Sequence, residues 1–466
     1  MIQPSETSEF IDEGQINQIL SETKECDSHR VRNVLQKARE LNGLTLEEAA
    51  VLFSINSSEL TEELFDTAKY AKTEIYGSRI VFFTPLYISN LCFNNCAYCA
   101  FRSTNTDMKR RALSMEEIAH EVQLIIDQGH KRILIVSGES YGTSGLQYVL
   151  DAIKTAYSVK SNGGEIRRIN VNIAPLTVPE FEELKKTEIG TFQIFQETYH
   201  RETYRSVHLG GRKRDYDWRV TAVDRAMAAG ISDCGIGPLL GLYDWRFELL
   251  AMLMHIRHLE NLFGVGPHTI SVPRIEPALG SALATAPPHK VSDDDFRKII
   301  AILRLTVPYT GIILSTRETP IMRRDALNFG VSQISAGSRV NPGGYEENEQ
   351  FDTAQFALGD HRCLEEVILD VIRLGYIPSF CTGCYRMGRV GKDFMDLAYP
   401  GDIKAHCDPN GLSTFMEYLL DYASETTRKE GEELIEKILA GQTDENRTRS
   451  ISLLDQVRAG KRDVYC

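Results

Sequence analysis

Short apolar runs of β type recur along the middle of the chain, and each is followed by apolar residues at helical spacing. Eight such runs are present, at 80–88, 132–137, 169–173, 191–196, 233–238, 269–274, 311–315 and 333–336. Because helices alternate with them, we predict that the runs are parallel strands of one sheet. Eight strand–helix units over roughly 260 residues have the size of a closed (β/α)8 barrel of the TIM type, and hence an α/β fold.

Sequence signals for helix starts separate the predicted strands. Ser114 with Glu117, and Thr177 with Glu180, form capping-box patterns, and Ser292 opens a further helix. One more helix is predicted over 215–230. A barrel of this kind carries its active site at the carboxyl ends of its strands, so functional residues are expected just after each run.

Two flanking regions lack the strand–helix alternation. Residues up to about Tyr76 are predicted to form helices with acidic surfaces, for example 28–41 and 45–53, which gives an N-terminal helical cap. After residue 344 the pattern loosens into a loop-rich stretch, and a charged helical tail is predicted from 412 to about 459. We therefore predict three parts: a helical region at 1–78, the barrel at 79–344 and a C-terminal extension at 345–466.

Composition narrows the class of protein. The 466 residues include 52 Lys and Arg against 65 Asp and Glu, a formal charge of -13, which disfavours a nucleic-acid partner. No apolar run approaches the roughly 20 residues that cross a bilayer, and the N-terminus has no signal-peptide pattern. We expect a cytoplasmic protein with no membrane partner that acts on small molecules.

Three cysteines follow the first predicted strand. Cys92, Cys96 and Cys99 have the spacing C-x3-C-x2-C. Three thiolates on one short loop can hold three irons of a [4Fe-4S] cluster and leave the fourth iron open. A structural zinc site is disfavoured, because zinc takes four ligands and the loop offers no fourth Cys or nearby His.

This triad, with Tyr98 before its last cysteine, resembles the hallmark of the radical S-adenosylmethionine (SAM) enzymes. The resemblance implies a radical SAM barrel in which Cys92, Cys96 and Cys99 hold a [4Fe-4S] cluster. It also implies that the open iron chelates the amino and carboxylate groups of SAM, and that reduction yields a 5'-deoxyadenosyl radical. Tyr98 is then expected to lie against the adenine.

Three charged residues match further positions of that family. Glu139, after the second strand, matches the acidic motif that meets the amino group of SAM, and Glu197 ends the fourth strand. Arg219 resembles the arginine that pairs with the SAM carboxylate. Carboxylates for an ammonium group and an arginine for a carboxylate are what a zwitterion requires.

A second set of three cysteines lies in the C-terminal extension. Cys381, Cys384 and Cys407 have the spacing C-x2-C-x22-C, and spacing alone leaves open a zinc site completed by His406 or His361. Together with the first triad, however, this spacing resembles the tyrosine lyases of [FeFe]-hydrogenase maturation, from about residue 45 to the C-terminus. That resemblance implies an auxiliary [4Fe-4S] cluster and so a cluster-binding extension.

His268 stands at the start of the sixth predicted strand, directly before the run 269–274. A lone histidine beside a barrel strand is more often a structural residue than a ligand. In the resembled family, the matching histidine binds a labile fifth iron attached to the auxiliary cluster, and an imidazole nitrogen suits ferrous iron. We therefore predict that His268 is that ligand, although it stands at the start of its strand and the expected site lies at strand ends.

Candidate substrate residues follow the seventh and eighth strands. Arg317 can clamp an amino-acid carboxylate bidentately, with Ser315 as an additional donor, and related aromatic amino-acid lyases have an arginine at the matching place. Ser338 lies in a Gly-rich segment after the eighth strand. It either contacts the substrate or belongs to a turn that closes the barrel.

The resemblance implies a complete reaction. L-tyrosine would be cleaved between Cα and Cβ to p-cresol and dehydroglycine, and dehydroglycine would become CO and cyanide on the auxiliary cluster. The product would be an iron, CO, cyanide and cysteine unit for assembly of the hydrogenase H-cluster. Implied partners are L-tyrosine, free cysteine, a reductant such as flavodoxin or ferredoxin, and other hydrogenase maturases.

Three other functions stay open at this point. The tyrosine lyase of thiamine biosynthesis, 2-iminoacetate synthase, shares the barrel and substrate but ends at dehydroglycine, and the second cysteine set and His268 argue against it. A biotin-synthase-like sulfur-insertion enzyme would need cluster cysteines inside the barrel, which are not evident. A non-catalytic iron–sulfur carrier would bind clusters without cleaving SAM. Cys26, Cys234, Cys363 and Cys466 have no predicted role.

Overall fold

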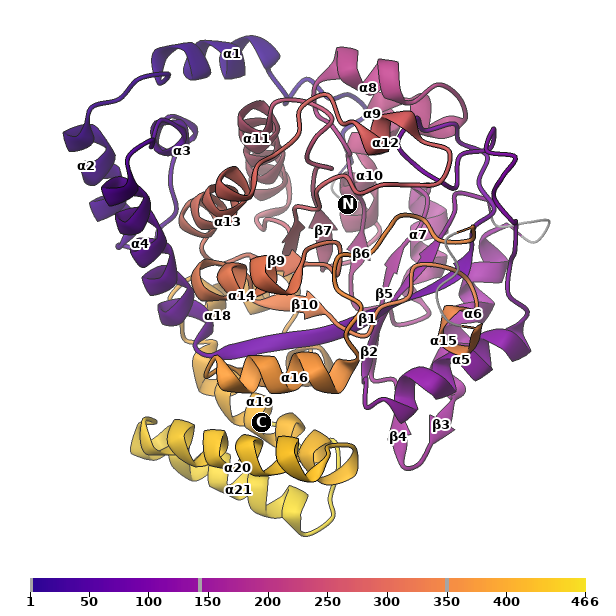
Figure 1. Ribbon diagram of the computed structural model, residues 1–466, viewed down its shortest axis with the longest axis vertical. Helices are drawn as coiled ribbons and strands as arrows, with labels where there is room; N and C mark the ends of the chain where they lie inside the picture. The colour runs from indigo at the N-terminus through magenta and orange to yellow at the C-terminus, as the bar shows by residue number, and fades with distance from the viewer. Residues whose placement is uncertain (1–2, 141–144, 348–351) are drawn as a thin grey trace.

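A closed parallel barrel forms the centre of the protein (Figure 1). The computed structural model describes residues 3–140, 145–347 and 352–466. Its barrel strands are β1 (Arg79–Ser89), β2 (Arg132–Ser137), β5 (Arg168–Asn172), β6 (Phe192–Gln193), β7 (Cys234–Ile236), β8 (Thr269–Ser271), β9 (Gly311–Leu314) and β10 (Gln333–Ser335). Neighbours in this order pair in parallel, and β10 pairs back onto β1. The predicted barrel is confirmed, and each predicted run overlaps one strand.

Helices and short elements follow the strands around the barrel. They are α5 (Met115–Asp127), α6 (Leu146–Ser158), the hairpin β3 (Lys160–Ser161) and β4 (Gly164–Glu165), α7 (Val178–Lys185), α8 (Arg201–Val207), η2 (Arg212–Arg214), α9 (Tyr216–Val220), α10 (Ala222–Ala228), α11 (Trp245–Phe263), α12 (Ala282–Thr285), α13 (Asp293–Thr306), α14 (Pro320–Phe329), α15 (Gly344–Glu347) and α16 (Leu364–Arg373). The capping boxes at Ser114 and Thr177 are both present.

The single helix predicted over 215–230 was wrong. The structure has two helices, α9 and α10, which meet at Thr221. The hydroxyl of Thr221 donates to the carbonyl oxygen of Asp217 at 2.6 Å. Such local hydrogen bonds from Thr compete with the regular helix ladder, so they favour a break at this point.

β1 is the longest barrel strand, and all of its residues are buried. Residues 84–89 of β1 pair with β2, whereas residues 79–81 pair in parallel with β11 (Ile377–Ser379). β11 therefore adds a strand at the amino end of the barrel. The chain that follows β11 carries the three candidate cysteines Cys381, Cys384 and Cys407, and it begins at this end, opposite the carboxyl ends where barrel active sites lie.

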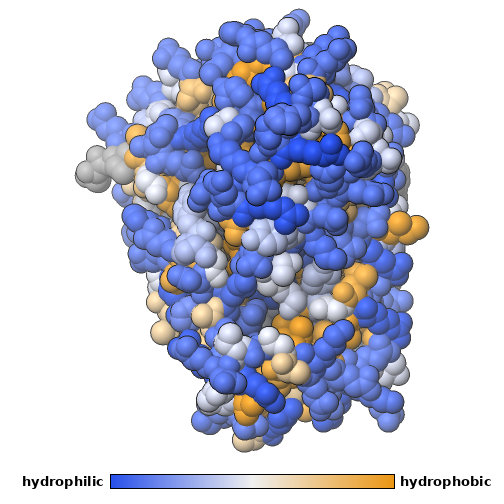
Figure 2. Space-filling model, turned by 90° about the vertical axis from the view of Figure 1, so that its left-hand side faces the viewer, coloured by the Kyte–Doolittle hydropathy of each residue, from blue (hydrophilic) through white to orange (hydrophobic). Residues whose placement is uncertain are grey.

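Four helices precede the barrel and confirm the predicted N-terminal helical cap: α1 (Glu13–Glu22), α2 (Ser28–Ala38), α3 (Leu46–Phe53) and α4 (Ser58–Tyr76). Helices α1, α3 and α4 pack against the barrel helices α11, α13 and α14, and α2 packs against α3 and α4 (Figure 1). The surface on this side of the molecule is mostly hydrophilic, with small separated apolar patches (Figure 2). This surface suits helices that face solvent on one side and the barrel on the other.

The C-terminal extension is more regular than predicted. It contains α17 (Gly383–Arg386), α18 (Gly391–Ala398), α19 (Lys404–Asp421), α20 (Glu425–Ala440) and α21 (Asp444–Arg458). The prediction of a loop-rich stretch up to residue 411 was wrong, because α16, β11 and α18 lie there and α19 begins at Lys404. Pro409 lies inside α19, where proline costs roughly 3 kcal/mol. Burial of this helix against β11 and α21 outweighs that local cost.

Candidate active site

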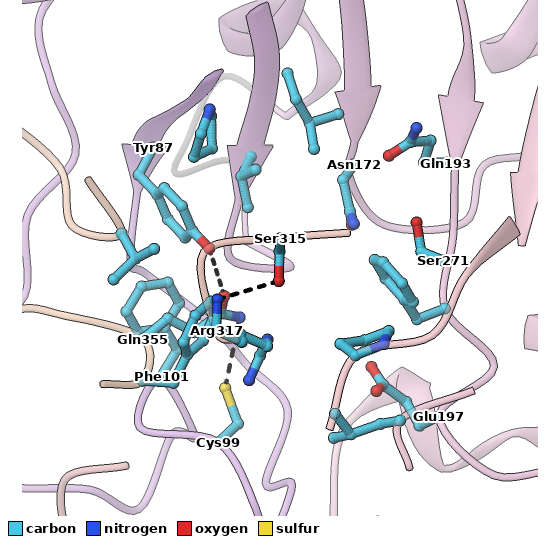
Figure 3. A pocket seen from close by; sticks show the side chains of 18 of the residues that line it. Tyr87, Cys99, Phe101, Asn172, Gln193, Glu197, Ser271, Ser315, Arg317 and Gln355 are labelled. Atoms are coloured by element: carbon cyan, nitrogen blue, oxygen red, sulfur yellow. Dashed lines mark hydrogen bonds between the residues drawn. The ribbon is translucent and has the colours of Figure 1, made fainter. Parts of the chain in front are cut away.

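A cavity opens at the carboxyl ends of the barrel strands (Figure 3). Nine of the predicted site residues line it: Cys92, Cys96, Tyr98, Cys99, Glu139, Glu197, Arg219, Ser315 and Arg317. They follow β1, β2, β6 and β9 or lie on α9, and only the closed barrel brings them to one place. Most of these residues come just after a strand, as the sequence predicted, and parallel strands of a barrel bring such residues to the same end.

The cysteine loop that follows β1 is held firmly at both of its sides. The side chain of Asn90 donates to the carbonyl oxygen of Lys109 and accepts from the amide of Arg111, each at 2.7 Å. Farther along, Cys96 pairs with His208 in an antiparallel bridge. Burial raises the pKa values of Cys92, Cys96 and Cys99, that of Cys99 to about 11. The three thiols are therefore neutral by themselves, and a bound metal would stabilise their thiolate form.

Four charged side chains form a network beside the cysteine loop. Glu139 pairs with Arg219 at 2.6 Å, and Glu197 pairs with Lys213 at 2.5 Å. Burial by itself would raise the pKa of Glu139, but Arg219 and Lys213 outweigh burial and lower it. Because two carboxylates face two cations, the network can exchange partners with a zwitterionic ligand. The amide of Asn94 donates to Glu139 at 2.6 Å and completes the network.

Sequence reasoning missed Lys213 and Asn94. Lys213 belongs to the run Arg212-Lys213-Arg214, which reads as a solvated surface charge cluster. The structure instead turns Lys213 into the cavity, and its ion pair with Glu197 is one tenth exposed. Glu197 itself has a backbone φ of +72°, a conformation rarely taken by residues other than glycine. Such a backbone outlier beside a cavity is typical of functional sites.

The aromatic residue of the cysteine loop is fixed by a histidine. The hydroxyl of Tyr98 lies 2.9 Å from Nε2 of His208, and the two rings meet edge to face. Burial raises the pKa of Tyr98, so it stays neutral. The ring of Tyr98 therefore has one fixed orientation in the cavity wall.

Arg317 faces the same cavity as a buried cation, on which the carboxylates of Glu276 and Glu197 act electrostatically (Figure 3). Its guanidinium group lies over the ring of Phe356, 3.2 Å from the ring centroid. No ion pair or hydrogen bond of this group is recorded within the described parts of the chain, and burial lowers its pKa. Ser315 lies beside it and accepts from its backbone amide at 3.4 Å. This geometry is suited to binding a carboxylate that enters the cavity.

The cavity wall behind Arg317 carries a further polar chain. The hydroxyl of Tyr87 donates to Gln355 at 2.7 Å, and the amide of Gln355 lies 3.9 Å from Sγ of Cys99 (Figure 3). Neither Tyr87 nor Gln355 was predicted from sequence. Tyr87 is one of the inward-facing residues of β1, and the alternation along that strand could have identified it.

Ser338 is not among the residues that line the cavity. It is buried, at 2% exposure, in the segment that follows β10. Its position favours the alternative of a turn that closes the barrel over contact with a substrate.

A second cavity lies at the amino end of the barrel. It is lined by Cys381, Cys384, Cys407 and His268, together with Arg79, Arg132 and Arg168. His268 immediately precedes β8, so it lies at the amino end of that strand. From the sequence, functional residues were expected at the carboxyl ends of strands, and His268 did not fit that expectation. The second cavity, at the amino ends, explains its position.

Asp233 fixes the surroundings of His268. One carboxylate oxygen of Asp233 lies 3.5 Å from Nδ1 of His268 and accepts from the amide of Gly391 at 2.9 Å. The other accepts from Arg168 at 3.0 Å. Burial lowers the pKa of His268 to about 4, so its imidazole is neutral, which is the form that binds metals.

The thiols of the second cavity are electrostatically linked to arginines. A hydrogen bond shared with Cys407 lowers the pKa of Cys384, and Arg389 and Arg79 act in the same direction. Arg79, Arg132 and Arg168 are the first residues of β1, β2 and β5, so they form one layer at the barrel's amino end. An arginine at the start of three apolar runs is a sequence signal that our prediction did not use.

The donor sets of both cavities suit iron–sulfur clusters. In the described part of the chain, no three His, Cys, Asp or Glu side chains converge as ligands of a single metal ion would. In a four-iron cluster each thiolate binds a different iron, so the thiols need not converge on one point. Three thiols in each cavity, with one neutral imidazole in the second, fit such clusters chemically.

Comparison with known proteins agrees with this reading. The radical SAM superfamily model matches residues 86–253, and the Biotin and Thiamin Synthesis associated domain matches residues 271–377. The 2-iminoacetate synthase of Escherichia coli (strain K12) is 31% identical over 362 residues, which cover 77% of this chain and 92% of that protein. The second match crosses residue 344, and the division of the chain into 1–78, 79–344 and 345–466 stays a prediction.

Two crystal structures match over nearly the whole chain. That of HydG, a maturase of the [FeFe]-hydrogenase, is 47% identical with a TM-score of 0.95, and the match covers 98% of this chain and 100% of HydG. HydG from Carboxydothermus hydrogenoformans is 42% identical with a TM-score of 0.83, over 94% and 97% of the two chains.

Barrel, cysteine loop and family match together define a radical SAM enzyme, whose cofactors are SAM and a [4Fe-4S] cluster. Within that superfamily, the chain belongs to the HydG family of [FeFe]-hydrogenase maturases. The described residues include no helix that is long and apolar enough to cross a membrane.

Proposed function

We propose that this protein is the tyrosine lyase of [FeFe]-hydrogenase maturation. It cleaves L-tyrosine between Cα and Cβ to p-cresol and dehydroglycine, and converts dehydroglycine to CO and cyanide for assembly of the H-cluster. The observation that supports this most directly is the pair of three-cysteine cavities at opposite ends of one barrel. A lyase that ended at dehydroglycine would need only the first cavity.

At the first cavity, Cys92, Cys96 and Cys99 would hold the [4Fe-4S] cluster. Bound together, the cluster and SAM supply a 5'-deoxyadenosyl radical. For SAM itself, Glu139 and Glu197 would receive the amino group and Arg219 the carboxylate, which exchanges ion pairs already present in the network. Tyr98, fixed by His208, would lie against the adenine.

The substrate residues orient tyrosine within the same cavity. Arg317 and Ser315 would bind its carboxylate, because Arg317 is a buried cation facing the cavity and Ser315 lies beside it. With the carboxylate fixed there, the amino group is directed to where hydrogen is abstracted. With SAM and tyrosine bound, the barrel walls would exclude water, and the residues would contribute by positioning the reactants, with no acid or base required.

At the second cavity, Cys381, Cys384 and Cys407 would hold the auxiliary [4Fe-4S] cluster and His268 the labile fifth iron. Asp233 faces Nδ1 of His268 and so directs Nε2 to the metal, as carboxylates commonly do beside metal-binding histidines. Free cysteine would complete the iron product. The protein partners of this enzyme would be other maturases and a flavodoxin or ferredoxin.

A single anaerobic incubation tests the proposal. Reconstituted, dithionite-reduced protein is mixed with SAM, tyrosine and deoxymyoglobin, and p-cresol and the CO-haem absorbance are measured together. We expect both products. Formation of p-cresol without CO, in protein shown by iron analysis to hold both clusters, would favour the second candidate, 2-iminoacetate synthase, to which the chain is 31% identical. Absence of p-cresol would contradict both.

A further inference from the structure

Two large apolar side chains are exposed beside the cysteine loop of the first cavity. Phe93 is 74% exposed and Leu209 is 55% exposed, and within the described residues few large apolar side chains are as accessible. Phe93 is the neighbour in sequence of Cys92 and lies between two proposed cluster ligands. Exposed apolar side chains of this size cost solvation free energy, and together they mark interaction surfaces.

Backbone pairing brings the two segments that carry these side chains together. Asn95 donates to the carbonyl oxygen of Gly210, and Leu209 donates to that of Asn95, both at 2.9 Å. Gly211 has a φ of +82°, and a Cβ there would lie 2.9 Å from the carbonyl oxygen of Phe93. The cysteine loop and the segment that follows α8 are therefore joined side by side, directly outside the first cavity.

The charge of this surface is opposite to that of the whole protein. Segments 90–107 and 202–215 together carry five basic and three acidic residues, a net positive charge in a chain of formal charge -13. Arg205, Arg212 and Arg214 are exposed among these five. Lys213 turns inward to Glu197. We name the exposed apolar and basic residues, Phe93, Leu209, Arg205, Arg212 and Arg214, the cluster-loop surface.

We propose that the cluster-loop surface docks a small acidic electron-transfer protein of the flavodoxin or ferredoxin class. This rests on the proposed function in one respect, since SAM cleavage requires one electron for the cluster. The reduced carrier gives up one electron and the cluster gains it, and no atom is transferred. Docking here would place the carrier against the loop that carries the proposed ligand Cys92. A small apolar centre with a basic rim suits a transient redox encounter, which is weak and electrostatically steered.

Binding is tested with a bacterial flavodoxin as probe. Cluster-loaded protein is titrated with oxidised flavodoxin by calorimetry, and its Kd is compared with those of Phe93→Ser with Leu209→Ser and of Arg205→Glu with Arg214→Glu. We expect each pair of changes to raise Kd about tenfold. Added salt should weaken the binding of flavodoxin to the parent protein more than its binding to the arginine variant. The matched control, Ile451→Ser with Arg458→Glu on the distant α21, should leave Kd unchanged.

Activity separates this inference from the proposed function. With dithionite as reductant, the cluster-loop variants should form 5'-deoxyadenosine at the parent rate, because dithionite needs no docking surface. With reduced flavodoxin their rates should fall about tenfold. Unchanged flavodoxin Kd and rates would overturn the inference, and so would a change of oligomeric state in the variants, which would make the surface an interface between copies. If the parent protein itself showed no activity with dithionite, this result would instead contradict the proposed function.

Discussion

Replacing Arg317 by lysine tests how the substrate carboxylate is held. The guanidinium lies over Phe356 and faces the cavity, and no carboxylate of the described residues forms a salt bridge with it, although Glu276 acts on it electrostatically. A bidentate pair with a carboxylate would therefore form without breaking an existing ion pair. Lysine keeps the positive charge but offers a point charge in place of the planar fork, and it loses the stacking over Phe356.

The size of the effect follows from the lost hydrogen bond. A hydrogen bond to a charged group contributes about 1.5–3 kcal/mol, and Arg317→Lys loses one of two. At 1.4 kcal/mol per factor of ten, this corresponds to a rise in the KM for tyrosine of roughly 10- to 150-fold. Burial already lowers the pKa of Arg317, so the more readily deprotonated lysine is expected toward the upper end of that range.

Anaerobic initial rates of p-cresol formation at varied tyrosine give KM and kcat. Formation of 5'-deoxyadenosine without tyrosine should be unchanged, because Arg317 does not belong to the charged network beside the cysteine loop. Arg324→Lys, on the exposed face of α14 where the arginine pairs with Asp370, is the matched control. A KM for tyrosine that stays at the parent value in Arg317→Lys would refute the placement of the carboxylate.

Four further changes test the rest of the site and the fold. Cys96→Ala should abolish 5'-deoxyadenosine formation with and without tyrosine, and retained formation would contradict the first cluster. Cys381→Ala with Cys384→Ala should spare p-cresol and eliminate CO, whereas equal loss of both would mean that the cavities are not independent. His268→Ala should remove the fifth-iron signal from the electron paramagnetic resonance spectrum, and an unaltered spectrum would reject this ligand. Burial raises the pKa of Glu248 to about 8. Folded-state Glu248 therefore holds a proton that the unfolded state loses between pH about 4.5 and 8, and its contribution to stability should fall by about 1.4 kcal/mol per pH unit as the pH rises through that window. In thermal unfolding, the stability difference between the parent and Glu248→Gln should change by this amount per pH unit, and a difference that stays constant with pH would contradict it.

The local sequence was sufficient to predict the barrel and most of the first cavity. Apolar runs and capping residues depend on neighbours a few positions away, so strands such as 132–137 could be predicted with their bounds. Because parallel barrels present functional groups after each strand, the order of the elements also placed Cys92, Glu139 and Arg317 at one end.

Contacts between segments far apart in the chain decided the features that the sequence did not predict. Pairing of β11 with the first residues of β1 placed the second cysteine set at the amino end of the barrel. His268 lies at the same end and lines the same cavity, although its position in the sequence argued against a site there. Lys213 turns inward because Glu197 lies buried opposite it, and nothing in its basic run indicates this. α19 forms through Pro409 because burial against β11 and α21 outweighs local propensity. Hydrophobic periodicity and capping are properties of adjacent residues, whereas the two cavities depend on how residues far apart in the chain meet, and this only the closed fold determines.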